Sequence, residues 1–173
     1  DTDITLTATT GDVAHSVIKV TDESGNSSTA TNVKIAIDNT APVISSITDT
    51  GGNAKSLGKS GDQIEIRGSG FVLTGTDDSI VKFGGQTTAD LGITVNSITN
   101  TKITLTLGNT EVSGAQVTVT DEAENVGTGG NFTIDNTKPT VSSVATRYIK
   151  NGATSVVTGN GFTTNGDASD VKI

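Results

Sequence analysis

The chain has 173 residues, with 19 acidic and 11 basic side chains, a net charge of −8 and no Cys, Met or Trp. This charge argues against nucleic acid, which needs clustered Lys and Arg, and against an anionic membrane surface. Without a run of 18 apolar residues we expect no membrane insertion, and without Cys there are neither disulfides nor thiolate sites.

Short phrases recur along the chain at a nearly constant spacing. "ITLT" recurs after 99 residues, as does "VTDESGN" at Val20, which returns as "VTDEAEN" at Val119. "IDNTAP" and "IDNTKP" hold the only two prolines, Pro42 and Pro139, 97 residues apart. A period close to 100 residues matches one β-sandwich domain.

The repeats predict one complete domain flanked by two partial ones. Residues 1–40 match the C-terminal half of a unit, residues 41–139 form a complete unit, and residues 140–173 match the N-terminal half. We therefore expect the chain to be an excerpt of a longer array. The prolines then lie at the joints, where their fixed φ and missing N–H restrict the backbone.

Apolar and polar residues alternate in the complete unit, which predicts strands. "QIEIR" places Ile64 and Ile66 on one face and Gln63, Glu65 and Arg67 on the other. The remaining expected strands are "VISSIT" (43–48), "IVKFG" (80–84), "ITVNSI" (93–98), "ITLTL" (103–107), "QVTVT" (116–120) and "FTI" (132–134), with Val81, Phe83, Ile103, Leu105, Leu107, Val117, Val119, Phe132 and Ile134 facing inward. The pattern predicts an all-β fold of tandem Ig-like antiparallel β-sandwiches.

The partial units follow the same pattern with one conflict. The first repeats it with Ile4, Leu6, Ile18, Val20, Val33, Ile35 and Ile37. In the third, Ser155 occupies the position of Ile64, so the second strand of that unit is the less secure prediction.

Several of these phrases together resemble the bacterial surface Ig-like domains of the IPT/TIG type. They are "GDQIEIRGSGF", "VKFGG", "TKITLTL" and "AQVTVTDEAENVG". The resemblance implies an Ig-like fold, used in tandem in adhesins and surface-layer proteins and singly in some carbohydrate-active enzymes. The second copy departs from the pattern, since Glu124 stands where Gly25 stands in the first, which predicts a turn of different shape.

No constellation suited to catalysis is found, and we expect no enzyme activity. "TDTGG" (48–52) resembles the Asp-Thr-Gly signature of aspartic proteases, but the equivalent segment "VATRYIK" has no Asp, so a Gly-rich turn is predicted. "GSGF" and "GNGF" have no following helix to form a phosphate site, which predicts turn glycines beside core residues Phe71 and Phe162. His15 is the only His, and a solvated hairpin residue is predicted.

Acidic loops around the first joint carry the one site hypothesis, an interdomain Ca²⁺. Sandwich topology brings the linker close to the loops after the second and penultimate strands. The candidate ligands are Asp38, Asn39, Asp77, Asp78, Asp121 and Glu122. Ca²⁺ prefers carboxylate and carbonyl oxygens, and the linker resembles the cadherin-type "DN-x-P" joint. The alternative is that these residues only form turns.

The leading functional expectation is a structural segment of a long extracellular surface protein, acting through tandem rigid Ig-like modules. A surface-layer lattice or filament component and an adhesin stalk both fit, and the divergence of the units favours the former. The expected partners are neighbouring Ig-like domains of the same chain, with lateral self-assembly. The alternative is an accessory module of a secreted carbohydrate-active enzyme, for which only Tyr148 offers a stacking ring. The two partial units are also complementary halves of one domain.

Overall fold

The computed structural model describes residues 3–9, 11–71 and 80–162. Regular secondary structure within these ranges consists of strands alone, so the predicted all-β fold is confirmed. None of the described residues belongs to a helix with the length and apolarity needed to cross a membrane.

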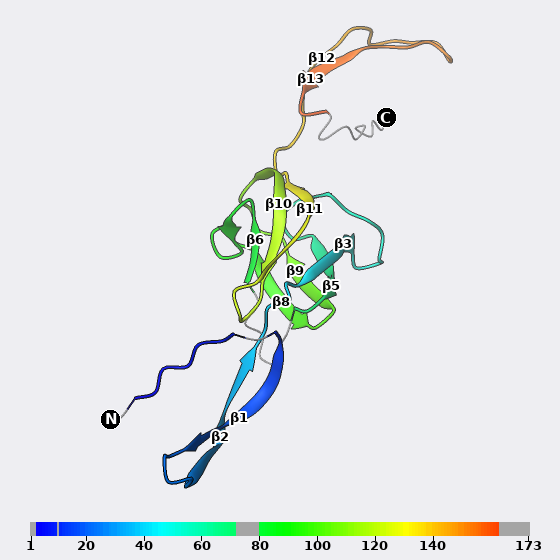
Figure 1. The fold of residues 1–173 in the computed structure, drawn as a ribbon. Helices are drawn as coiled ribbons and strands as arrows, with labels where there is room; N and C mark the ends of the chain where they lie inside the picture. Colours follow the sequence, from blue (N-terminus) through cyan, green and yellow to red (C-terminus); the bar gives the residue numbers. More distant parts are fainter. Residues whose placement is uncertain (1–2, 10, 72–79, 163–173) are drawn as a thin grey trace.

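The strands follow the chain order of Figure 1. They are β1 (Val13–Thr21), β2 (Ser27–Ile37), β3 (Val43–Asp49), β4 (Leu57–Gly58), β5 (Gln63–Ser69), β6 (Ile80–Phe83), β7 (Gln86–Thr87), β8 (Thr94–Thr99), β9 (Lys102–Thr106), β10 (Val112–Thr120), β11 (Val126–Ile134), β12 (Thr140–Val144) and β13 (Val157–Asn160).

Two sheets form a β-sandwich in the middle of the molecule (Figure 1). One has the order β3-β5-β9-β8 and the other β4-β11-β10-β6-β7. All pairs are antiparallel except β4 with β11, where Leu57 and Gly58 run parallel to Thr133 and Ile134. Sequence alternation missed β4 because two residues are too few to show a period.

The buried hydrophobic residues among those that the structure describes form one cluster, to which both sheets of the sandwich contribute. Its buried members all fall between Ile47 and Ile134, and the rings of Phe83 and Phe132 meet edge to face at 6.1 Å. Every residue predicted to face inward in the complete unit is at most 2% exposed, which confirms the strand assignment. Burial of a large apolar side chain contributes about 1.5–3 kcal/mol, so this cluster dominates the stability of the sandwich.

The outer face of β5 is less solvated than the alternation suggests. Glu65 points away from the core but is only 5% exposed. Lys102 Nζ lies 2.9 Å from one of its carboxylate oxygens, and Arg67 pairs with the other. The hydrogen bond from Lys102, with the charge of Arg67, holds the pKa of Glu65 below its ordinary value of 4.5.

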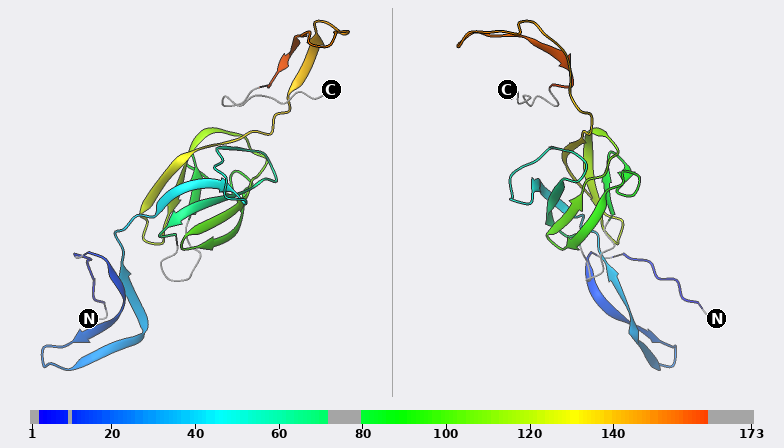
Figure 2. Two further views of the ribbon diagram at one scale, coloured as in Figure 1. Left: turned by 90° about the vertical axis from the view of Figure 1, so that its right-hand side faces the viewer. Right: turned by 180° about the vertical axis from the view of Figure 1, so that it is seen from behind.

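Two isolated hairpins lie at opposite ends of the sandwich (Figure 2). β1 pairs with β2, and β12 with β13. The strand predicted around Ile4 and Leu6 does not form, and these side chains are 69% and 60% exposed. The reason is a missing partner, because in the sandwich the equivalent strand β9 pairs with β5.

The conflict at Ser155 shortens the last strand. β13 begins only at Val157, whereas its counterpart β5 extends through the position equivalent to Ser155. The Ser155 hydroxyl donates to the carbonyl oxygen of Thr146 at 2.9 Å and accepts from its N–H at 3.0 Å. These side-chain bonds replace ladder pairing at this point.

One five-residue turn occurs three times in the described chain. Asp22, Asp49 and Asp121 each open it, and each accepts at Oδ1 from the N–H groups two and four residues later. The residue before the closing Asn always has positive φ, 86° at Gly25 and 66° at Glu124. The prediction that Glu124 changes the shape of the turn is therefore wrong, because the Asp and Asn bonds impose the conformation. "TDTGG" is the third copy, which confirms the predicted turn.

Candidate functional site at the domain joint

The first joint is held by a carboxylate from the hairpin before it. Asp12 Oδ1 accepts from the N–H of Asn39 at 2.7 Å, and its Oδ2 accepts from the Thr40 hydroxyl. The hydrogen bond from Thr40, followed by that from Asn39, lowers the pKa of Asp12 from its ordinary value. Asp38 Oδ1 accepts from the N–H of Thr40 at 2.9 Å. The "DNT" phrase thus forms a turn anchored to Asp12, the residue directly before β1.

The second joint repeats this arrangement with equivalent residues. Glu111 Oε1 accepts from the N–H of Asn136 at 3.2 Å and from the Thr137 hydroxyl. Asp135 Oδ1 accepts from the N–H of Thr137 at 2.9 Å. Sequence reasoning missed Asp12 and Glu111, although both directly precede a strand and share the 99-residue spacing of the repeat.

The joint prolines pack against the glycines of the repeated "GxGF" phrase. A Cβ on Gly70, which has a φ of 76°, would lie 3.3 Å from Pro42 Cα. A Cβ on Gly161, with a φ of 72°, would lie 3.4 Å from Pro139 Cα. The ring of Phe71 is fully buried beneath this turn. The interpretation of "GSGF" as turn glycines beside a core Phe is confirmed.

The predicted neighbours of the linker can be placed in part. Asn125 Nδ2 donates to the Asp38 carbonyl at 3.1 Å, so the linker lies against the turn that Asp121 opens. Asp121 is 5% exposed, and its carboxylate already accepts from the N–H groups of Ala123 and Asn125 and from Asn125 Nδ2. Glu122 is exposed on the same turn. Asp77 and Asp78 lie outside the described residues.

These contacts bear on the suitability of the joint for calcium. Among the described residues, no three His, Asp or Glu side chains are grouped so as to hold a metal ion. The Asp121 carboxylate already accepts three hydrogen bonds within its turn, which uses most of its capacity as an acceptor. The Oδ2 atom of Asp38, at the joint, is buried and has no hydrogen-bond partner among the residues that the structure describes. Interdomain calcium therefore stays a prediction.

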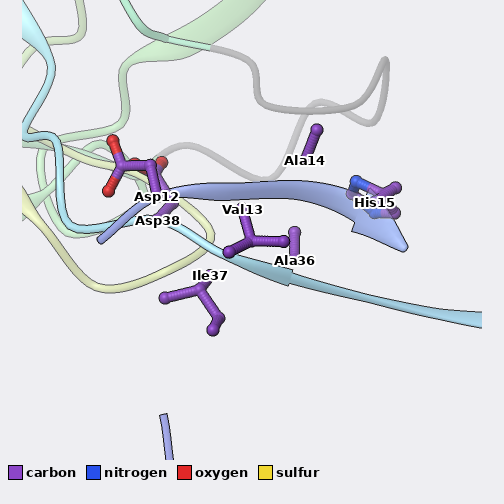
Figure 3. A pocket seen from close by; sticks show the side chains of 7 residues that line it. All are labelled: Asp12, Val13, Ala14, His15, Ala36, Ile37 and Asp38. Atoms are coloured by element: carbon purple, nitrogen blue, oxygen red, sulfur yellow. The ribbon is translucent and has the colours of Figure 1, made fainter. Parts of the chain in front are cut away.

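A shallow hollow accompanies each joint. At the first it has a volume of about 220 Å³, with Asp12 and Asp38 near one another and His15 farther along β1 (Figure 3). Val13 and Ile37 are among its apolar lining residues. At the second, residues from Glu111 to Ser113 and from Thr133 to Asp135 line a hollow of about 330 Å³. His15 is exposed on β1 of the first hairpin, which confirms the prediction of a solvated hairpin residue.

Comparison with known proteins adds little to this description. No family model and no curated protein matches the chain. Among solved structures, the chain is similar to a gamma-CGTase from alkalophilic Bacillus clarkii, with 22% sequence identity and a TM-score of 0.45. The match covers 71% of this chain and 18% of that protein. A likeness of this size carries no functional information.

Proposed function

We propose that the chain is a structural segment of a long extracellular surface protein, in which β-sandwich units are joined at fixed angles. The observation that supports this most directly is the repeated joint, in which Asp12 and Glu111 bind the "DNT" linkers in the same way. A linker that served only as a flexible connection would need neither a buried proline nor a dedicated carboxylate.

The physical case for a stiff joint rests on three constraints. Pro42 is buried and fixes its own φ. Asp12 ties the linker to the preceding hairpin, and Asn125 ties it to the following sandwich. Bonds to both sides leave few backbone torsions free, which suits a load-bearing or lattice component. The net charge of −8 favours a well-solvated surface.

Joint stiffness can be measured by electron-spin distance distributions. Because the chain has no Cys, labels at Ser28→Cys and Ala89→Cys would be the only thiols. We expect a narrow distribution that broadens in Asp12→Ala, while Asp3→Ala, with the same change of charge, leaves it narrow. Equal widths in both variants would refute a stiffened joint. Antibody labelling of intact cells tests the surface location separately.

A second candidate function has one specific observation in its favour. Tyr148 is 94% exposed on the segment between β12 and β13, and an exposed ring can stack on sugars. Phe71, Phe83 and Phe132 are fully buried and offer no such platform. If the chain is an accessory carbohydrate-binding module, its electrophoretic migration should be retarded in polysaccharide-containing gels. This retardation should be lost in Tyr148→Ala. Unchanged migration with a panel of polysaccharides would exclude this candidate.

A further inference from the structure

The loop between β12 and β13 is held by hydrogen bonds at its base and at its tip. At the base, the Ser155 hydroxyl bonds to both backbone groups of Thr146, at 2.9 and 3.0 Å. At the tip, the N–H of Ala153 donates to the carbonyl oxygen of Lys150 at 2.9 Å. The side chains between these bonds are therefore presented on a backbone of defined shape.

The side chains at the tip of this loop are exposed, and the complete sandwich shows that this exposure is a property of the repeat unit. Tyr148 is 94% exposed, and Arg147 and Lys150 are exposed beside it. The preceding strands match at a spacing of 97 residues, which places these three side chains at the positions of Thr50, Gly51 and Asn53. Those positions are exposed although every strand of their sandwich is present.

The tip is cationic in an acidic protein. Residues 140–162 contain Arg147 and Lys150 and no carboxylate, whereas the whole chain has a net charge of −8. Neither cation forms an ion pair with a residue that the structure describes, in contrast to Arg67 and Lys102, which both pair with Glu65. At physiological ionic strength, charges more than about 8 Å away are largely screened. The two free cations can therefore attract an anionic ligand despite the acidic remainder of the chain.

We propose that this loop binds an acidic polysaccharide. The ring of Tyr148 stacks on the face of a sugar, while Arg147 and Lys150 pair with carboxylates of the polymer. A stable protein partner contacts about 20–30 residues a side, far more than the tip offers. A polysaccharide repeats its ligand along the chain, so that weak single contacts add up.

This inference does not rest on the structural role of the joints. It shares Tyr148 with the second candidate function and differs from it in requiring a charged ligand. The repulsion between a polyanion and a chain with a net charge of −8 makes the test selective, because retention then requires a local cationic site.

Two polymers of the same sugar isolate the contribution of charge. Agarose beads carry either polygalacturonate or its methyl ester, in which the carboxylates are neutral, and depletion of the protein from solution gives the dissociation constant. We expect binding to polygalacturonate to be at least about tenfold tighter than to the ester. Weakening by added salt should accompany it. Absence of binding to polygalacturonate, or equal binding to both polymers, overturns the proposal. Equal binding would leave the second candidate function standing.

A charge-matched pair of double variants locates the site. Arg147→Gln combined with Lys150→Gln should raise the dissociation constant for polygalacturonate at least about fivefold. Lys19→Gln combined with Lys34→Gln removes the same charge from exposed positions of β1 and β2 and should change it less than about twofold. Equal effects of the two double variants would contradict a binding site at the loop.

Substitutions of the ring complete the test. Tyr148→Ala should raise the dissociation constant at least about fivefold, whereas Tyr148→Phe keeps the stacking face and should change it less than about twofold. All these positions lie outside the core cluster, so the melting temperature of the sandwich confirms that each variant is folded. Equal binding by the two Tyr148 variants, or self-association in sedimentation that is lost with Arg147 and Lys150, overturns the proposal, the latter by assigning the loop to an acidic protein surface. None of these outcomes alters the spin-label widths that test the joints.

Discussion

Replacing Glu124 with Gly is expected to stabilise the sandwich. Glu124 is exposed and holds a φ of 66°, whereas the same turn has Gly at positions 25 and 52. A left-handed conformation costs a residue with a Cβ about 1–2 kcal/mol. Gly offsets about 0.4–1 kcal/mol of this stabilisation, because it increases the conformational entropy of the unfolded chain.

The net gain of Glu124→Gly is about 0.5–1 kcal/mol, which raises the melting temperature of a domain of this size by about 2–8 °C. Scanning calorimetry is the suitable assay because the chain has no Trp to report unfolding. Glu124→Ala is the control, since it removes the carboxylate but keeps the Cβ, and it should leave the melting temperature nearly unchanged. Gly52→Ala should lower the melting temperature, because a φ of 86° is strained for a residue with a Cβ. The added Cβ would meet no atom within 4 Å, so this strain alone would account for the loss. A melting temperature for Glu124→Gly at or below the wild-type value would refute the reasoning.

Three further outcomes are expected. Gly68→Ala should destabilise the sandwich by more than about 3 kcal/mol in urea unfolding, because the Cβ would lie 1.8 Å from the Val43 carbonyl oxygen, whereas Gly130→Ala has open space and should change stability little. Because folding lowers the pKa of Glu65, its carboxylate adds to the free energy of unfolding above pH 4.5, and this contribution is lost as pH falls through the folded-state pKa. Glu65→Gln should therefore make the free energy of unfolding depend less on pH in acid, and an unchanged dependence contradicts this. If calcium binds the joint, small-angle scattering profiles with calcium and with chelator should differ, and identical profiles would remove the calcium hypothesis.

Predictions from sequence succeeded where a local pattern carried the information. Ile64, Ile66 and Val119 were assigned inward from alternation alone, and all three are fully buried. The prediction for Glu124 failed because residue preference was weighed without the two Asp121 hydrogen bonds that impose the left-handed turn. For Ile4, alternation was present but the partner strand was not, and a strand needs both.

At the joint, the division between sequence and structure has a clear physical basis. Alternating side chains and the repeated "IDNT" phrases already imply an all-β fold with two equivalent linkers, because burial on one face of a strand leaves a period in the sequence itself. The residues that bind those linkers cannot be identified from a local sequence pattern. Asp12 reaches Asn39 across 27 positions and Asn125 reaches Asp38 across 87, and only the folded chain brings such residues together. Hydrogen bonds between distant residues leave no local period, so the anchoring role of Asp12 and Glu111 and the commitment of Asp121 to its own turn were decided by the tertiary structure.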